Sequence, residues 1–161
     1  MLPDEPWLRR HPSNDELFWT DECEEVAVEE PWGDSDDYAE IPFADEPSIE
    51  DYQRALATGV APSHEKEHYV RMRLWWATND PVRRGETNTL SDRENLLKLL
   101  TFLDDSVPDQ RLMAAEVCRE LGDFDRASVL LKFQFPKDYD DAVNLIKKLN
   151  EQKDVSVRQV A

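Results

Sequence analysis

The residues best suited to chemistry are His64, Glu65 and His68, in the stretch His-Glu-Lys-Glu-His at 64–68. On a helix, side chains four positions apart lie on one face, so both imidazoles could reach one metal ion. A glutamate beside them is the residue type that polarises a zinc-bound water. The spacing satisfies H-E-x-x-H and H-x-x-E-H together, which raises the hypothesis of zinc-dependent hydrolysis.

The surroundings of this motif favour a helix start over an active site. Its two intervening positions, Lys66 and Glu67, are charged, and it directly follows Ser63, a residue type that begins helices. Acidic residues in a first turn interact favourably with the helix dipole, and that turn is normally exposed. A third ligand would have to be Glu86 or Glu94, neither of which belongs to a recognisable motif. We therefore expect no catalytic residue, no cofactor and no resident metal; a zinc metallopeptidase is the most distant of three functional hypotheses.

The two cysteines add no reactive group. Cys118 lies on the apolar side of an expected helix, as an inert core thiol does, and acidic neighbours on both sides of Cys23 disfavour its thiolate. The N-terminal sequence does not have the pattern of a signal peptide, so we expect reduced thiols and a bacterial-type cytoplasmic location.

The charge of the chain is large and unevenly placed. The 161 residues carry a net charge of −17. Residues 1–60 hold 18 Asp and Glu against three Arg, a net of −15, whereas residues 61–161 hold 18 acidic against 16 basic residues, a net of −2. Such a chain is poorly suited to nucleic acid or an anionic membrane, because phosphate contacts need Lys and Arg. No apolar run approaches the ~18 residues that span a bilayer.

Composition divides the chain into three parts: an acidic arm at 1–47, a helical domain at 48–151 and a C-terminal tail at 152–161, which we expect to fray. A disordered acidic tail would rarely carry many aromatic residues, so the arm should pack on the helical part. Its expected anchors are Trp7, Phe18, Trp19, Trp32, Tyr38, Ile41 and Phe43. The pair Phe18-Trp19, with Val26 and Val28, predicts a short strand or hairpin.

Helix signals from residue 48 onward predict an all-α domain of five to six helices. Ser48 with Asp51, and Ser91 with Glu94, have the spacing of capping boxes. The expected helices run from 48 to a stop at Gly59, from 63 to about 79 before Asp80-Pro81, from 91 to about 104, from Pro108 to Gly122, from Asp123 to about 131, and from after Pro136 to about 149.

The stretch AAEVCRELGDFDRASVLL resembles the middle of a tetratricopeptide repeat. Gly122 and Ala127 stand where that family has the glycine of the inter-helix turn and a small residue of the second helix. Gln134 and Pro136 depart from the pattern, and the resemblance covers about one repeat. It implies a helical hairpin that binds other proteins, although an αα-hairpin is also a common way to pack helices.

The stretch LRRHPSNDELFW resembles the C-P-x-C-G start of a zinc ribbon in bacterial proteins of uncharacterised activity. His11 and Asn14 stand where that family has its two cysteines, and Asp15 stands where it has glycine. Because Asn is a poor zinc ligand, the resemblance implies a degenerate half-site that has lost its metal.

Two further hypotheses make the chain a non-enzymatic binder of a protein partner, and the sequence does not determine its oligomeric state. In the first it is an adaptor-like helical domain whose helical hairpin holds the partner, with Trp75 and Trp76 as candidate contacts. Adjacent indoles point about 100° apart on a helix, so burial of both needs cover on two sides. The pair is expected first to pack in the core, between the next helices and the acidic arm, and a peptide groove with Trp as its floor is the alternative. In the second it is an acidic inhibitor, immunity-type protein or nucleic-acid mimic that blocks a basic partner. Its expected contacts are Glu22, Glu24, Glu25, Glu29, Glu30, Asp34, Asp36 and Asp37. The arginines near Trp75 and Trp76 are expected to pair with carboxylates of the arm: Arg71, Arg73, Arg83 and Arg84.

Overall fold

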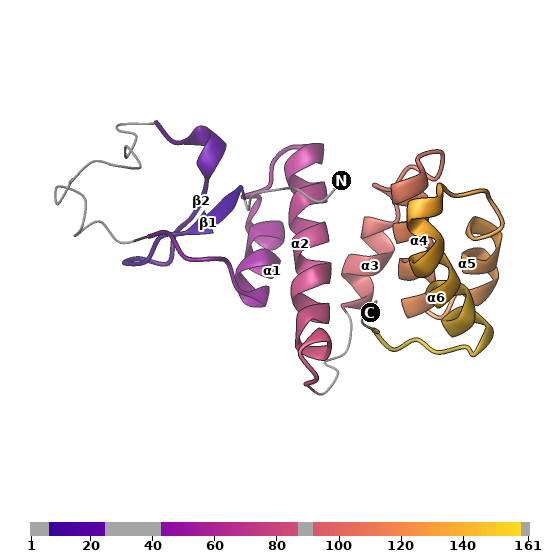
Figure 1. Ribbon diagram of the computed structural model, residues 1–161. Coiled ribbons are helices and arrows are strands. Elements are labelled where there is room, and N and C mark those ends of the chain that lie inside the picture. The colour runs from indigo at the N-terminus through magenta and orange to yellow at the C-terminus, as the bar shows by residue number, and fades with distance from the viewer. Residues whose placement is uncertain (1–6, 25–42, 87–91, 159–161) are drawn as a thin grey trace, which may run out of the picture.

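A computed structural model describes residues 7–24, 43–86 and 92–158. Its elements follow one another in an elongated row from the hairpin to the C-terminal helices (Figure 1). They are β1 (Leu8–Arg10), β2 (Leu17–Trp19), η1 (Thr20–Glu22), α1 (Ile49–Thr58), α2 (His64–Arg83), α3 (Arg93–Leu99), α4 (Pro108–Glu120), α5 (Phe124–Leu130), η3 (Lys137–Tyr139) and α6 (Asp140–Glu151). The prediction of an all-α fold with a short β-hairpin is confirmed. In the part of the chain that is described, every helix is too short or too polar to cross a bilayer.

The N-terminal hairpin pairs β1 and β2 antiparallel, with Leu8 opposite Trp19 and Arg10 opposite Leu17. The strand predicted at Phe18-Trp19 is present, and its partner comes from residues 8–10. Val26 and Val28 lie outside the described residues. An isolated bridge between Arg10 and Asp45 adds the segment before α1 to the other edge of β1.

Helix α1 begins and ends where its sequence signals predict. The Ser48 hydroxyl accepts from the Asp51 amide, and the Asp51 carboxylate accepts from the Ser48 amide, which completes the capping box. Gly59 follows the helix in the left-handed conformation.

Helix α2 begins as predicted, with the Ser63 hydroxyl accepting from the Lys66 amide. Its predicted end near Asn79 is wrong, since the helix continues to Arg83 with Pro81 inside its last turn. Pro81 removes only one amide donor, and the Asp80 carbonyl still accepts from Arg84 at 3.0 Å. A proline this close to the C-terminus therefore leaves the final turn closed.

The predicted bounds of the third helix are also corrected. The N-cap of α3 is Asp92, whose carboxylate accepts from the Asn95 amide at 3.0 Å; Ser91 lies outside the described residues. The helix ends at Leu99, because the Thr101 and Phe102 amides bond to carbonyls three residues back in tighter turns.

Helices α4 and α5 form the predicted helical hairpin. Gly122 has φ +80°, a conformation that favours glycine, and the Asp123 carboxylate accepts from the Arg126 amide at the start of α5. Ala127 is fully buried, which lets the two helices approach closely. The tetratricopeptide resemblance itself stays a prediction.

The residues after α6 pack back onto the helices as far as they are described, contrary to the expected fraying. Val157 is 5% exposed, and the Arg119 guanidinium of α4 donates to the Asp154 carbonyl. A buried side chain and an anchored carbonyl restrain this segment.

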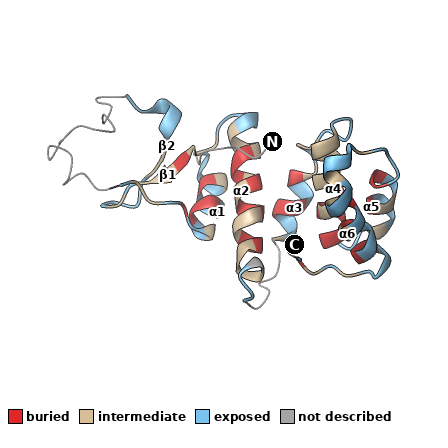
Figure 2. Ribbon diagram, in the orientation of Figure 1, coloured by how far each residue is buried: buried red, intermediate tan, exposed pale blue. Residues whose placement is uncertain are grey.

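Three cores follow one another along the row, and buried positions line the helix faces that meet there (Figure 2). The hairpin-end core contains Leu8, Trp19, Tyr52, Ala55, Tyr69, Val70 and Leu74. The middle core contains Met72, Trp75, Leu96, Leu99 and Val117. The C-terminal core contains Ala114, Ala115, Cys118, Ala127, Leu130, Leu131, Val143 and Ile146. Helix α2 contributes to the first two cores, so it is covered on two sides, by the hairpin and α1 and by α3 and α4.

Candidate functional site

The histidine pair that suggested zinc chemistry packs against an aromatic ring. The imidazoles of His64 and His68 both stack on Phe102, with ring centroids 4.5 and 5.5 Å away. His68 is partly buried, and that burial, followed by the charge of His64, lowers its pKa. Glu65 is exposed in the first turn of α2. The motif therefore contributes to the contact between α2 and the loop after α3.

A zinc centre would need a third ligand beside this pair. Glu86, one expected ligand, is exposed and pairs with Arg84 at 3.1 Å; Glu94, the other, is exposed on α3. Among the described residues, no group of three or more His, Cys, Asp or Glu side chains could hold a metal ion. The described geometry thus supplies two nitrogen ligands at most.

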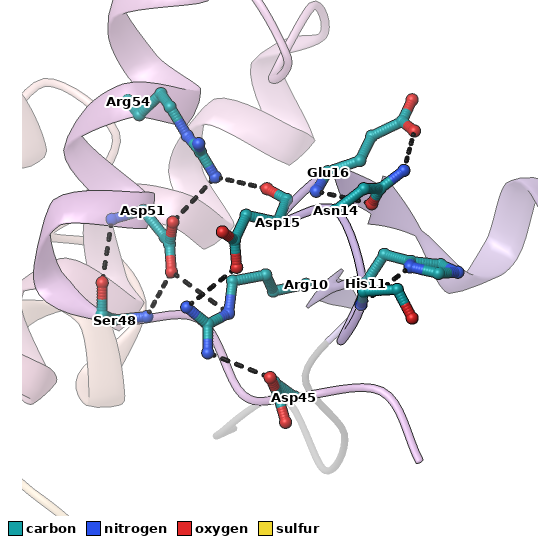
Figure 3. Close-up of polar contacts among 10 residues, drawn as sticks. Arg10, His11, Asn14, Asp15, Glu16, Asp45, Ser48, Asp51 and Arg54 are labelled. Atoms are coloured by element: carbon teal, nitrogen blue, oxygen red, sulfur yellow. Dashed lines mark hydrogen bonds and ion pairs between the residues drawn. The ribbon is translucent and has the colours of Figure 1, made fainter. Parts of the chain in front are cut away.

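The segment with the zinc-ribbon resemblance forms the whole hairpin, and His11, Asn14 and Asp15 lie in its turn (Figure 3). Side-chain atoms of the turn that could bind a metal take part in local hydrogen bonds. The His11 Nδ1 accepts from the Ser13 amide, and the Asn14 side chain accepts from the Glu16 amide and donates to the Glu16 carboxylate. Asp15, at the expected glycine position, has φ +58°. The left-handed conformation is the one that glycine favours, and Asp tolerates it better than most residues.

The same turn carries a charged cluster centred on Arg10 (Figure 3). Its guanidinium lies 3.4 Å from Asp15, 2.9 Å from Asp45 and 3.9 Å from Asp51. Arg54 of α1 donates to the Asp51 carboxylate and to the Asp15 carbonyl, both at 2.8 Å. This cluster attaches the segment that leads into α1 to the hairpin.

The two predicted partner-binding tryptophans have different surroundings. Trp75 is 6% exposed and donates its indole N–H to Glu120 of α4 at 3.0 Å. Trp76 is half-buried, packs on the middle core and has the Arg73 guanidinium 5.9 Å from its ring centroid. Trp76 is therefore the one of the pair that a partner could contact without unpacking the fold.

Trp76 lines an open groove of about 670 Å³ between α2 and the start of α1. The full lining is Glu46, Pro47, Ser48, Ile49, Tyr52, Arg73, Trp76, Ala77, Asp80, Pro81 and Arg84. Its apolar part comes from residues of both walls, including Pro47 and Pro81. Its charged part contains two acidic and two basic side chains.

Arg73 ties the two walls of the groove together. It forms an ion pair with Glu46, and its Nε donates to the Tyr52 hydroxyl at 3.3 Å. Burial raises the pKa of Tyr52, and the hydrogen bond from Arg73 opposes this shift. Of the neighbouring arginines, Arg71 pairs with Glu67 of its own helix, so only part of the expected pairing with the arm is present. The side chain of Arg83 lies outside the description.

The acidic contacts predicted on the arm are mostly outside the described residues: Glu25, Glu29, Glu30, Asp34, Asp36 and Asp37. Of the other two, Glu22 pairs with Lys66 of α2, and Glu24 is exposed. Lys66 also lies 4.5 Å from the centroid of the Trp19 ring. The arm thus contacts the helical part here through charge and an aromatic face together.

The aromatic anchors of the arm behave unequally. Trp7 stacks on Tyr69 at 5.4 Å, and Trp19 meets the same ring edge-on at 5.7 Å. Phe43 is 93% exposed, so the prediction that it anchors the arm is wrong. Trp32, Tyr38 and Ile41 lie outside the described residues.

Cys118 has the environment expected of it: the residue is fully buried, and burial raises the pKa of its thiol to about 11, while Cys23 is exposed. Sequence reasoning missed two features. The groove wall at Glu46 and Pro47 has no local signal, because it forms only when the chain before α1 lies against α2. The burial of Glu120 had a local signal in the sequence: Glu120 follows Val117 by three residues and so lies on the apolar side of its helix.

No family model matches the chain, and no curated protein or solved structure is significantly similar to it.

Proposed function

We propose that the chain is a non-enzymatic protein-interaction module, adaptor-like, that binds an apolar segment of a protein partner in the groove along α2. The observation that carries this proposal is the half-buried Trp76 in an open groove whose walls are apolar at Pro47, Ile49 and Pro81. Tryptophan in a partly desolvated groove is a frequent centre of binding energy.

The charges of the groove indicate which partner segment fits. Glu46 and Arg73 satisfy each other, and the remaining acidic and basic lining residues, Asp80 and Arg84, are one of each sign. A strongly charged peptide would gain little from such a surface, whereas an apolar or proline-containing segment would bury Trp76. Binding through this groove should therefore depend weakly on salt.

The test uses the full chain immobilised on beads and an extract of the native host at about 0.1 M and about 0.5 M salt. A partner recovered at both concentrations is identified and purified, and its affinity is measured for the wild type and for Trp76→Ala. We expect the substitution to weaken binding about tenfold or more. Phe133→Ala is the matched control, because it removes an exposed aromatic side chain far from the groove. Equal affinity of the wild type and Trp76→Ala would contradict the proposal.

The second candidate is a charge-driven inhibitor or nucleic-acid mimic. It is favoured by the net charge of −15 in residues 1–60 and by the continued exposure of Asp21 and Glu22, whose side chains are 54% and 62% accessible despite their pairing with Lys66. Long-range attraction to a basic partner weakens steeply with ionic strength. Recovery of the partner only at low salt, with no effect of Trp76→Ala, would favour this alternative.

A further inference from the structure

A buried carboxylate connects two helices on opposite sides of the middle core. Glu120 of α4 is 7% exposed and accepts from the Trp75 indole at 3.0 Å and from the Asn79 amide at 3.2 Å, both on α2. Asn79 is itself 2% exposed. The carboxylate therefore lies between the part of the molecule that contains the hairpin and the part that contains α4–α6.

No described cation forms an ion pair with this carboxylate. The neighbouring Arg119 is fully buried, but its guanidinium binds Glu116 and the Asp154 carbonyl. On α3, Arg93 donates to the carbonyl of Leu121. The ionised carboxylate is thus held by two neutral donors from α2. On its own helix the negative charge of Glu116 disfavours ionisation, and the positive charge of Arg119 partly offsets this effect.

We propose that Glu120 is a proton-binding joint between α2 and α4, and that uptake of one proton by its carboxyl group tightens the contact between the two ends of the molecule. The neutral carboxyl keeps the Trp75 bond through its carbonyl oxygen. It donates its O–H to the Asn79 side-chain oxygen once that amide has turned by about 180°. The buried charge, which costs free energy because no described cation forms an ion pair with it, is then removed.

The linkage between pH and stability follows from burial. Burial, and next the charge of Glu116, raises the pKa of Glu120 from 4.5 to about 7. Between these two values the folded chain binds more protons at this site than the unfolded chain does. The contribution of Glu120 to stability is therefore full below about pH 4.5 and is lost as the pH rises through about 7.

The experiment compares urea unfolding of the full chain and of Glu120→Gln between about pH 5 and about pH 8. Glutamine keeps the shape, and it can accept from Trp75 while donating to a turned Asn79. We expect similar urea midpoints at the acidic end and a higher midpoint for the variant at the alkaline end. Glu94→Gln, an exposed carboxylate on α3, should show no such pH-dependent difference.

A second measurement follows the wild-type chain itself and uses a variant only to assign one resonance. In the ¹⁵N-labelled wild-type chain, the indole N–H resonance of Trp75, assigned with Trp75→Phe, should shift in one transition near pH 7. The proposal is overturned if that resonance does not titrate between about pH 5 and pH 9. It is equally overturned if the stability difference between the wild type and Glu120→Gln does not change with pH.

Discussion

The hairpin end and the C-terminal end of this molecule are held together by different kinds of contact. At the hairpin end, Arg10 reaches Asp45, 35 residues away, and the Trp19 indole donates to the Val60 carbonyl, 41 residues away. At the C-terminal end, α4 and α5 are consecutive helices joined at Gly122, and alanines let them approach. The comparison teaches that the hairpin end depends mainly on contacts between distant segments. The C-terminal end combines a hairpin of consecutive helices with long-range contacts of its own, such as that of Arg119 with the Asp154 carbonyl, 35 residues away.

The largest expected effect is at the hairpin end. Trp19→Ala removes a 4% exposed ring, its edge-on contact with Tyr69 and its hydrogen bond to Val60. We expect a loss of about 3–5 kcal/mol in the free energy of unfolding, measured by urea titration. Phe18→Ala, on the same strand but only partly buried, should cost clearly less. Equal losses would mean that the hairpin does not depend on this aromatic contact.

The second-largest effect is expected at the C-terminal end, where a larger side chain in the core should lower the free energy of unfolding. Ala127→Leu places a larger side chain where α5 meets α4, at a position that is fully buried. We expect a loss of about 1–3 kcal/mol in thermal or urea unfolding, because a packed core has no room for the added methylenes. Val129→Leu, at a 55% exposed position of the same helix, is the control and should be nearly neutral. A neutral Ala127→Leu variant would show that the two helices are not in close contact.

The smallest expected effect concerns the charged cluster around Arg10. Asp45→Asn removes one of its ion pairs, in which the carboxylate is 45% exposed, so the expected loss is about 0.2–1 kcal/mol. Because solvent and salt reach this pair, the difference from the wild type should shrink as ionic strength rises. Glu116→Gln breaks the ion pair of the fully buried Arg119 at the other end of the molecule. Because salt does not reach that pair, the loss in stability caused by Glu116→Gln should not shrink as ionic strength rises. A loss for Asp45→Asn that salt does not reduce would contradict the interpretation of the Arg10–Asp45 ion pair as solvent-accessible.

Local signals predicted much of the fold. The Ser48 capping box, the Asp123 cap and the turn at Gly122 lie where expected, because each depends on hydrogen bonds within a few residues. The end of α2 was misplaced because Pro81 disfavours a helix without forbidding its last turn. The N-cap of α3 was misplaced by one residue, where an aspartate with the same capping chemistry follows a serine.

The candidate groove could be predicted only in part. The pair Trp75-Trp76 marked α2 as a helix covered on two sides, and this is confirmed by its place between the hairpin-end and middle cores. Which indole faces the interior depends on the position of α4, and the opposite wall at Glu46 depends on a chain segment 27 residues away from Arg73. Contacts at such separations leave no periodic pattern in the sequence.

The sequence by itself determined the helical class, most helix starts, the buried thiol of Cys118 and the strong acidity of the first 60 residues. Each of these follows from composition or from chemistry between near neighbours. The tertiary structure alone decided that the two histidines pack on Phe102, that Trp76 lines a groove, and that Glu120 is buried with no ion pair to a cation of the described residues. The physical reason is that burial and partnership depend on which distant segments meet, and the same carboxylate or imidazole has different chemistry in water and in a core.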